Sequence, residues 1–389
     1  MATSKSKFTI FEDSRVFTLL KDVYLPINPR FSSIMIEEKN GERKWKRVKV
    51  NIEDHIVFSS GKSLSFYDEY FSNYLSKLET NPFSENRPIY SITNVQIRDR
   101  AFNVVKWVPR AFMTMENTVQ DFGWGVLKRA LIEDDRTPIR SGDDGVEFRP
   151  IEIVTTMLSL DSIKQIKDKL NVTINDVITG VVIYGTRLYM QGVNKETCNG
   201  KCTALVLFNT RAVGDYKSVS DMIKPNSDMP WGNHFTFLPV PLPKLTSNDS
   251  INPIEFVVKA RSIIKRKRNS ASVFLTSRLL EIMRKVEGPE ATARYIHATL
   301  KHTSMEITNV IGPLEEMSLA NHPIKGLHSV VAGPPQSLSV TMVSYVDKLR
   351  VAIIVEKDFI DPNKLKSCFE YSFETIFNAA IKSSSLAGT

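Results

Sequence analysis

The chain has 389 residues, long enough for two domains, and its 42% hydrophobic and 24% charged residues are typical of a globular protein and exclude a disordered one. Its 51 basic and 43 acidic residues give a formal charge of +8, which favours an anionic partner such as a phosphate-rich cofactor or an acidic membrane face. The three cysteines exclude a disulfide framework and lack the further ligands of a zinc site, and no apolar run reaches the roughly 18 residues of a membrane span.

The first predicted element is a β-hairpin. Two β-rich runs, 34–36 and 45–50, flank a charged turn with an Asn-Gly dipeptide, which is a strong hairpin signal. His55 follows in a stretch that predicts a strand end or a turn, so we favour a structural histidine over a catalytic base. Aromatic and aliphatic residues at helical spacing over 66–78 predict a helix with one face in the core.

Residues 134–145 predict a linker between two halves, because they are acidic and contain glycine and proline. Two pairs of neighbouring carboxylates, Asp134-Asp135 and Asp143-Asp144, lie in this stretch. Such pairs in a loop are typical of solvated surface, which we favour over a metal site.

Beyond the linker, strands alternate with helices. A strand is predicted over 152–158, and a helix follows through Leu170, with Ser159 or Asp161 as its N-cap and Asn171 as its end.

The next helix, over 177–190, follows a capping signal. Thr173 and Asp176 have the spacing of a capping box, in which the hydroxyl and the carboxylate each bind a free backbone N–H. The same signals predict strands over 202–209 and 231–243 and helices over 252–268 and 272–286. The last of these helices stops at Gly288-Pro289.

A β-prone run over 305–311 ends abruptly at Gly312-Pro313, where glycine permits unusual dihedral angles and proline removes a donor. The pattern alone predicts a buried strand that ends in a turn. The predicted elements that follow are a strand over 326–331, a hairpin of strands over 337–345 and 349–355, and a helix over 363–381 that begins at Asp361-Pro362.

The run Thr308-Asn-Val-Ile-Gly-Pro313, followed by Ser337-Leu-Ser-Val-Thr-Met-Val-Ser-Tyr345, resembles the C-terminal half of the plant wax ester synthase/diacylglycerol acyltransferase family. The resemblance covers 119–380 and, more weakly, 29–78. It implies an α/β fold of the two-lobed, coenzyme-A-dependent acyltransferase type, with mixed sheets, flanking helices and a channel between the lobes. The implied domains are an incomplete N-terminal lobe over 1–125, a linker over 126–150 and a C-terminal lobe over 151–389.

The resemblance also implies a reaction. Members of the family transfer a fatty acyl group from acyl-CoA, a co-substrate, to a long-chain alcohol or diacylglycerol, without a bound cofactor or metal and without nucleic acid as a partner. The substrate-binding positions that the family motifs imply here are Asn175, Asp176, Asn233, Asn309, Gly312 and Pro313.

The family's hallmark HHxxxDG segment has no counterpart between Ile92 and Phe102, and the six histidines are isolated from one another. In the family that histidine takes the proton of the acceptor hydroxyl, which is a poor nucleophile without a base. His234 lies in a β-rich run, so we favour a structural residue in the wall of the fold over a catalytic base. We therefore predict no catalytic residue and an impaired acyltransferase. The alternative is a non-catalytic lipid- or partner-binding relative, a splice product or an incomplete gene model.

The resemblance implies peripheral contact with the cytosolic face of the endoplasmic reticulum or with the plasma membrane, and otherwise a cytoplasmic protein. The basic run 265–268 ends a predicted helix, where basic side chains suit the helix dipole and form a solvated face. Contact with anionic phospholipid or a cofactor phosphate is the functional alternative. Nucleic-acid binding ranks third, because aromatic side chains do not alternate with the charges.

Overall fold

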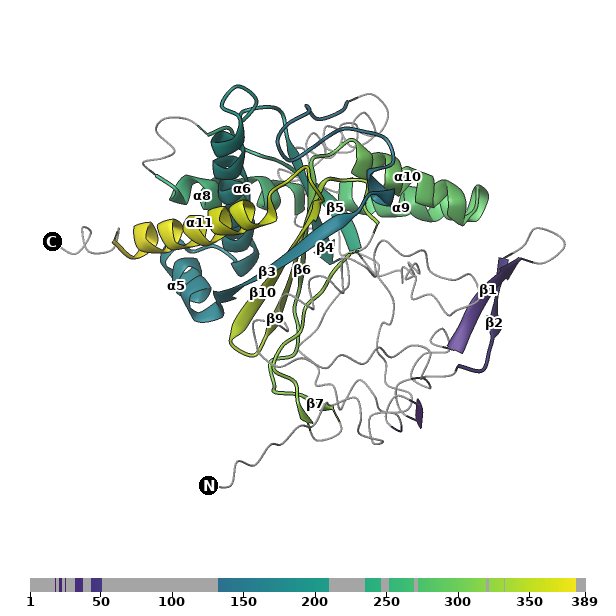
Figure 1. The fold of residues 1–389 in the computed structure, drawn as a ribbon. Helices are drawn as coiled ribbons and strands as arrows, with labels where there is room; N and C mark the ends of the chain where they lie inside the picture. Colours follow the sequence, from purple (N-terminus) through teal and green to yellow (C-terminus); the bar gives the residue numbers. More distant parts are fainter. Residues whose placement is uncertain are drawn as a thin grey trace, which may run out of the picture.

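The computed structural model describes residues 18, 21–22, 25, 32–37, 43–50, 132–209, 235–245, 252–268, 272–319, 322–331 and 333–382 (Figure 1). Several predictions lie outside these ranges and are not tested: His55, the helix over 66–78, the stretch between Ile92 and Phe102, and the positions of Asn233 and His234.

A six-stranded mixed sheet organises the described part of the chain, in the order β3-β10-β9-β6-β4-β5. Its strands are β3 (Ile151–Ser159), β4 (Thr203–Asn209), β5 (Phe235–Pro241), β6 (Met305–Val310), β9 (Leu338–Tyr345) and β10 (Lys348–Glu356). The central strand β6 runs parallel to β4 and to β9, whereas the outer pairs are antiparallel. The predicted mixed sheet is thus confirmed, and the β-prone run that begins at Met305 lies inside it as β6.

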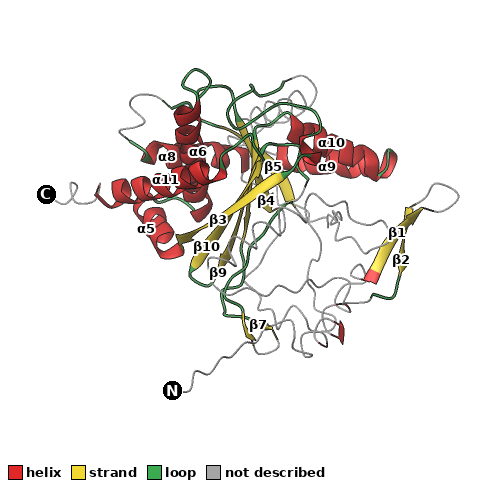
Figure 2. Ribbon diagram, in the orientation of Figure 1, coloured by secondary structure: helices red, strands yellow, loops and turns green. Residues whose placement is uncertain are grey.

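Four helices cover one face of this sheet (Figures 1 and 2). They are α5 (Leu160–Leu170), α6 (Ile174–Val193), α8 (Ile254–Arg268) and α11 (Pro362–Lys382). Helix α6 is buried along most of its length between α8 and α11. Its glycines permit this close packing, because a Cβ on Gly180 would lie 2.7 Å from Val257 Cα. The main hydrophobic core therefore lies between α6 and the sheet.

The remaining described elements are smaller or lie at the edge. Helices α9 (Ser272–Val286) and α10 (Pro289–Lys301) pack against each other, and α9 contacts β5. The strands β1 (Ser33–Glu37) and β2 (Arg43–Arg47) form the predicted antiparallel hairpin. A two-stranded sheet joins β7 (Ser318–Leu319) to β8 (His322–Pro323), and η5 (Val146–Phe148) is a single 3₁₀ turn.

The predicted caps are present and explain where the helices begin and end. Ser159, not Asp161, is the N-cap of α5 and accepts from Ser162 N at 3.2 Å, while Asn171 ends the helix with φ at 49°. The capping box at α6 is complete, with Asp176 N bonded to Thr173 Oγ1 at 3.2 Å and Thr173 N to Asp176 Oδ2 at 2.9 Å. These local signals hold because each satisfies backbone groups that a helix end leaves free.

One prediction near the centre of the chain needs correction, because residues 326–331 form no strand. The segment instead crosses the sheet, where Thr341 Oγ1 donates to Ser329 O and Arg350 Nη2 donates to Lys325 O. The predicted helix over 272–286, stopped at Gly288-Pro289, is confirmed as α9. The same dipeptide also begins α10, which was not predicted, since proline suits the first helical position.

The acidic stretch 134–145, which precedes the first strand of the sheet, is not a uniformly solvated loop. Asp134 is only 3% exposed, and its carboxylate accepts from Thr203 N at 2.6 Å, Thr203 Oγ1 at 3.0 Å and Ser304 Oγ at 2.8 Å. These bonds fix the stretch to the first residues of β4 and to the residue before β6. The expectation of solvated carboxylates is therefore wrong for Asp134, whereas Asp135 and Asp144 are exposed.

Candidate functional site

The two faces of the sheet differ in polarity. Side chains alternate between the faces along each strand, and the register places Glu306 beside Ser339 and Thr308 beside Thr341 across β6 and β9. The residues between them, such as Ile307, belong to the core under the helices. On β6 and β9, hydroxyl and carboxyl groups therefore line the face that points away from α5, α6, α8 and α11, while Ile153, Ala352 and Ile354 form a small apolar cluster on the same face.

Unpaired polar atoms are concentrated on or beside this polar face. Within the described ranges, five of the seven buried side-chain N and O atoms without a hydrogen-bond partner are Glu306 Oε1, Thr308 Oγ1, Gln336 Oε1, Ser339 Oγ and Arg350 Nη1. A buried polar atom without a partner costs about 1–3 kcal/mol, so such atoms are rare away from functional sites and water. Glu306 and Ser339 are neighbours in the register of β6 and β9, so this part of the polar face is the candidate place for a polar ligand group.

Glu306 has the most perturbed carboxyl group of this cluster. It is 3% exposed, and burial raises its pKa from 4.5 to about 7, while the neighbouring Ser339 hydroxyl acts in the opposite direction. The carboxyl group is thus divided between its two protonation states near neutral pH. This is the range in which a side chain can both accept and release a proton.

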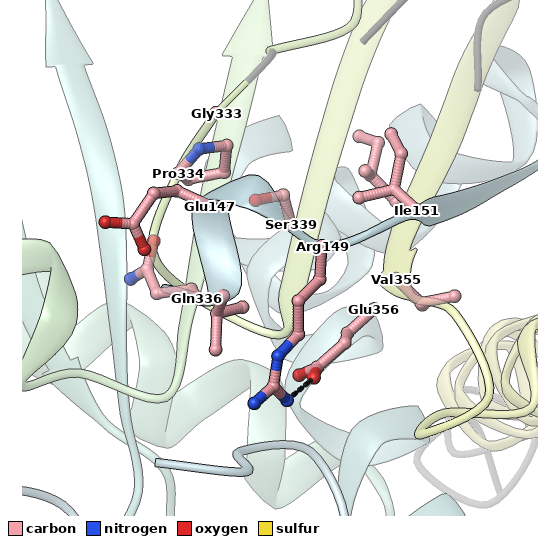
Figure 3. A pocket seen from close by; sticks show the side chains of 11 residues that line it. Glu147, Arg149, Ile151, Gly333, Pro334, Gln336, Ser339, Val355 and Glu356 are labelled. Carbon is pink, nitrogen blue, oxygen red and sulfur yellow. Dashed lines mark hydrogen bonds and ion pairs between the residues drawn. The ribbon is translucent and has the colours of Figure 1, made fainter. Parts of the chain in front are cut away.

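A small pocket adjoins the polar face where β3 begins and β10 ends (Figure 3). Gln336 and Ser339 line it, and both carry an unpaired buried oxygen. Arg149 and Glu356 form an ion pair in its wall, and Glu356 Oε2 also accepts from Ser141 Oγ at 3.0 Å. The pocket therefore combines fixed charges with two groups that are free to bind.

One histidine lies near this pocket. His297 Nε2 on α10 is 2.9 Å from Glu147 Oε1, and Glu147 lines the pocket. The pair is on the surface, because the His297 side chain is 46% exposed. It is therefore far less shielded from water than Glu306.

The structure brings together two of the substrate-binding positions that the resemblance implies. Asn309, near the end of β6, donates through Nδ2 to Asn175 Oδ1 at 3.5 Å, and Asn175 lies in the first turn of α6. Asp176 is 4% exposed and bonded within the capping box, so its described role is structural. Whether Asn175, Asp176 and Asn309 bind substrate stays a prediction.

Gly312 and Pro313 pack against the end of β9. Gly312 N donates to Ser344 Oγ at 3.1 Å, and Val346 N donates to Pro313 O at 3.2 Å. A Cβ on Gly312 would lie 2.0 Å from Ser344 O, so only glycine fits there. The Gly312-Pro313 motif thus fixes where β6 ends relative to β9. A contact of Gly312 or Pro313 with substrate stays a prediction.

The sequence pattern did not reveal Glu306, Gln336 or Ser339 as site residues. Glu306 carries the only available signal, a carboxylate at the second position of an otherwise apolar and hydroxyl-bearing strand. Ser339 and Gln336 are ordinary residues in the sequence, and their importance follows only from the register and burial.

The basic run at the end of α8 is not one solvated face. Lys265, Arg266 and Arg268 are exposed, but Lys267 is 4% exposed. The Arg268 guanidinium lies 5.5 Å from the centre of the Phe208 ring, a cation–π contact. Three of the four charged side chains of this run are therefore exposed at the surface. No helix within the described ranges has the length and apolar character needed to cross a membrane.

Comparison with known proteins places these features in a family context. Residues 231–377 match the WS/DGAT C-terminal domain. Wax ester synthase/diacylglycerol acyltransferase 4 of Arabidopsis thaliana is 26% identical over 436 residues, which cover 92% of this chain and 83% of that protein. Wax ester synthase/diacylglycerol acyltransferase 8 of the same plant is 26% identical over 457 residues, covering 95% and 90%.

A solved structure agrees with the expected fold. The wax ester synthase/diacylglycerol acyltransferase from Marinobacter aquaeolei VT8 superposes with a TM-score of 0.55 at 11% identity, covering 97% of this chain and 92% of that one. At this identity the likeness concerns the fold alone. The predicted α/β architecture of the acyltransferase type, with a mixed sheet and flanking helices, is thereby confirmed.

Proposed function

Because the chain belongs to the wax ester synthase/diacylglycerol acyltransferase family, we propose that it transfers a fatty acyl group from acyl-CoA to the hydroxyl of a long-chain alcohol or diacylglycerol. The observation that carries the proposal within the structure is the polar sheet face, where buried oxygens without partners converge. An alcohol needs such groups, since its hydroxyl must be held and deprotonated in a setting that excludes water.

We further propose that transfer by this chain is slow. No two histidines are adjacent anywhere in the sequence, so the usual histidine base of the family has no equivalent. A positioned base contributes about 10²–10⁴-fold to such a reaction. The same absence favours the second candidate function, a non-catalytic relative that binds lipid or a partner.

The test compares the chain with a version that carries a relative's HHxxxDG segment between Ile92 and Phe102. Both are assayed with palmitoyl-CoA and either hexadecanol or dioleoylglycerol. The restored chain should form ester at least about 10²-fold faster. The matched control carries the same segment with both histidines replaced by alanine. Equal rates for all three proteins would contradict the proposed impairment, and ester from none of them would favour the binding function.

The proposed site of action is the cytosolic face of a lipid membrane, most simply that of the endoplasmic reticulum. The support is indirect: the proposed substrates are lipids, and exposed basic side chains end α8. Attraction to an anionic leaflet amounts to about 1 kcal/mol for each basic residue near it.

A further inference from the structure

Glu306 differs from other buried carboxylates of the described ranges. The Asp134 carboxylate accepts three hydrogen bonds, Glu356 is paired with Arg149, and Asp176 caps α6. Glu306 is equally buried, yet its Oε1 atom has no hydrogen-bond partner. A carboxyl group of this kind has an unused acceptor atom and no structural task that explains its burial.

The surroundings of Glu306 are suited to a hydroxyl-bearing ligand. The adjacent strands β4 and β9 place Leu205 and Ser339 beside it, and Thr308 follows it on the same face. The Thr308 hydroxyl is buried without a partner, and the Ser339 hydroxyl lies close enough to Glu306 to lower its carboxyl pKa. These groups can hold a second hydroxyl by donating to or accepting from it, while Leu205 supplies an apolar wall.

No charged group on the neighbouring strands balances Glu306. Leu205 and Ser339 are neutral, and the next charges on the polar face, Arg350 and Glu356, belong to β10, one strand beyond β9. Arg350 donates to Lys325 O, and Glu356 pairs with Arg149. The crossing segment 324–331 carries Lys325 and His328, which are both exposed. The carboxyl group therefore keeps the basicity that burial gives it.

We propose that Glu306 accepts the hydroxyl proton of the acyl acceptor in this chain, as a less effective base than the absent family histidine. This deepens the proposed slow acyltransferase function and rests on it. Oε1 takes the proton while the acceptor oxygen bonds to the thioester carbonyl carbon. The carbon–sulfur bond then breaks, and the proton passes from Glu306 to the departing thiolate, which leaves as free CoA. The products are an ester and a thiol, and Glu306 returns to its carboxylate form.

The exposed His297–Glu147 pair is a weaker candidate for this role. His297 is 46% exposed, and its Nε2 atom is already engaged with Glu147. Water around such a pair would compete with the alcohol for the thioester. Glu306 combines burial with an unoccupied acceptor, so the geometry favours it.

The experiment substitutes Glu306→Gln, which keeps the side-chain size and removes the basic oxygen. The matched control is Glu370→Gln, a half-buried carboxyl on α11 that accepts from Thr156 Oγ1 at 2.6 Å on the helix-covered side of the sheet. Ester formation from palmitoyl-CoA and hexadecanol is measured from pH 5.5 to 8.5. Calorimetry measures the binding of 1-decanol to each protein at pH 6 and pH 8.

We expect kcat at pH 8 to fall at least about 10²-fold in Glu306→Gln, with KM for the alcohol changed less than about threefold. The rise of kcat between pH 6 and pH 8 should disappear, and Glu370→Gln should behave like the unaltered chain. A Glu306→Gln rate within about threefold of that chain would overturn the assignment while leaving the acyltransferase function intact.

If none of the proteins forms ester, that result counts against the proposed acyltransferase function. The binding of decanol then still tests whether Glu306 contacts the alcohol. A carboxylate accepts a stronger hydrogen bond than a neutral amide or acid. Binding by the unaltered chain should therefore tighten from pH 6 to pH 8, and binding by Glu306→Gln should not. Equal pH dependence in both proteins would exclude contact between Glu306 and the alcohol.

Discussion

At the scale of single residues, the burial of Glu306 predicts how stability depends on pH. Its carboxyl pKa is about 7 in the folded chain against 4.5 in the unfolded one, so the folded state binds more protons between these values. Stability therefore falls as pH rises through this window, by about 3 kcal/mol at 1.36 kcal/mol per unit. Glu306→Gln should remove that fall. Urea unfolding of the unaltered chain and of Glu306→Gln at pH 5 and pH 8 measures this fall in stability. An equal loss of stability in both proteins would contradict the burial of the Glu306 carboxyl group.

Asp134 makes a second prediction at this scale. Asp134→Ala leaves the donors Thr203 N, Thr203 Oγ1 and Ser304 Oγ without their acceptor, and should cost about 3 kcal/mol. Its neighbour Asp135 is exposed and accepts from Lys201 N, so Asp135→Ala should cost less than about 1 kcal/mol. Denaturant midpoints of the two variants give the comparison. Similar losses would show that Asp134 is not the group that fixes the stretch to the sheet.

At the scale of elements, the packing of α6 predicts opposite effects for two glycines of one helix. Gly180→Ala would place a Cβ 2.7 Å from the Val257 backbone on α8, and should cost about 1–3 kcal/mol through displacement of that helix. At Gly192, in the last turn, the nearest atom is the flexible Lys364 side chain at 3.6 Å, so alanine should stabilise by up to about 1 kcal/mol. Thermal unfolding of both variants tests the sign, and stabilisation by Gly180→Ala would refute the close approach.

The same scale explains what the sequence could predict. The caps at Ser159, Thr173 and Asp361 depend on atoms within a few residues, so local pattern located them. A mixed sheet with flanking helices was predicted from the family resemblance, whereas the order of its strands was not predicted. The segment 326–331 was misassigned because side chains of β9 and β10 bind backbone carbonyls within it and just before it, at Ser329, Ile324 and Lys325. No local pattern reveals such contacts.

The candidate site could be predicted only in part. Asn175 and Asn309 were named from family motifs, and the fold brings them into contact. The unpaired atoms of Glu306 and Ser339 could not be predicted, because a missing hydrogen bond depends on every element that surrounds the atom. Register pairs these two residues across 33 positions of sequence, a relation that exists only once the sheet has formed.

At the scale of the whole molecule, the formal charge of +8 and the exposed end of α8 predict binding to anionic membranes. Each basic residue near such a surface contributes about 1 kcal/mol, so replacing Lys265, Arg266 and Arg268 by glutamine should weaken binding by about 3 kcal/mol, roughly 10²-fold. Lys267 is left unchanged because it is buried, and its replacement would disturb the core. Co-sedimentation with phosphatidylserine vesicles at low salt measures the effect.

The control removes the same net charge from another helix. Lys164, Lys167 and Lys169 lie on α5, where Lys164 and Lys167 already pair with Asp161 and Asp168, respectively. If the α8 residues contact the lipid directly, the α5 triple glutamine variant should bind vesicles almost as well as the unaltered chain. If net charge alone drives the attraction, both variants should lose the same affinity, and raising the salt concentration should erase the difference from the unaltered chain. Equal losses would assign the end of α8 to solvated surface and leave the membrane-facing side of this protein to other residues.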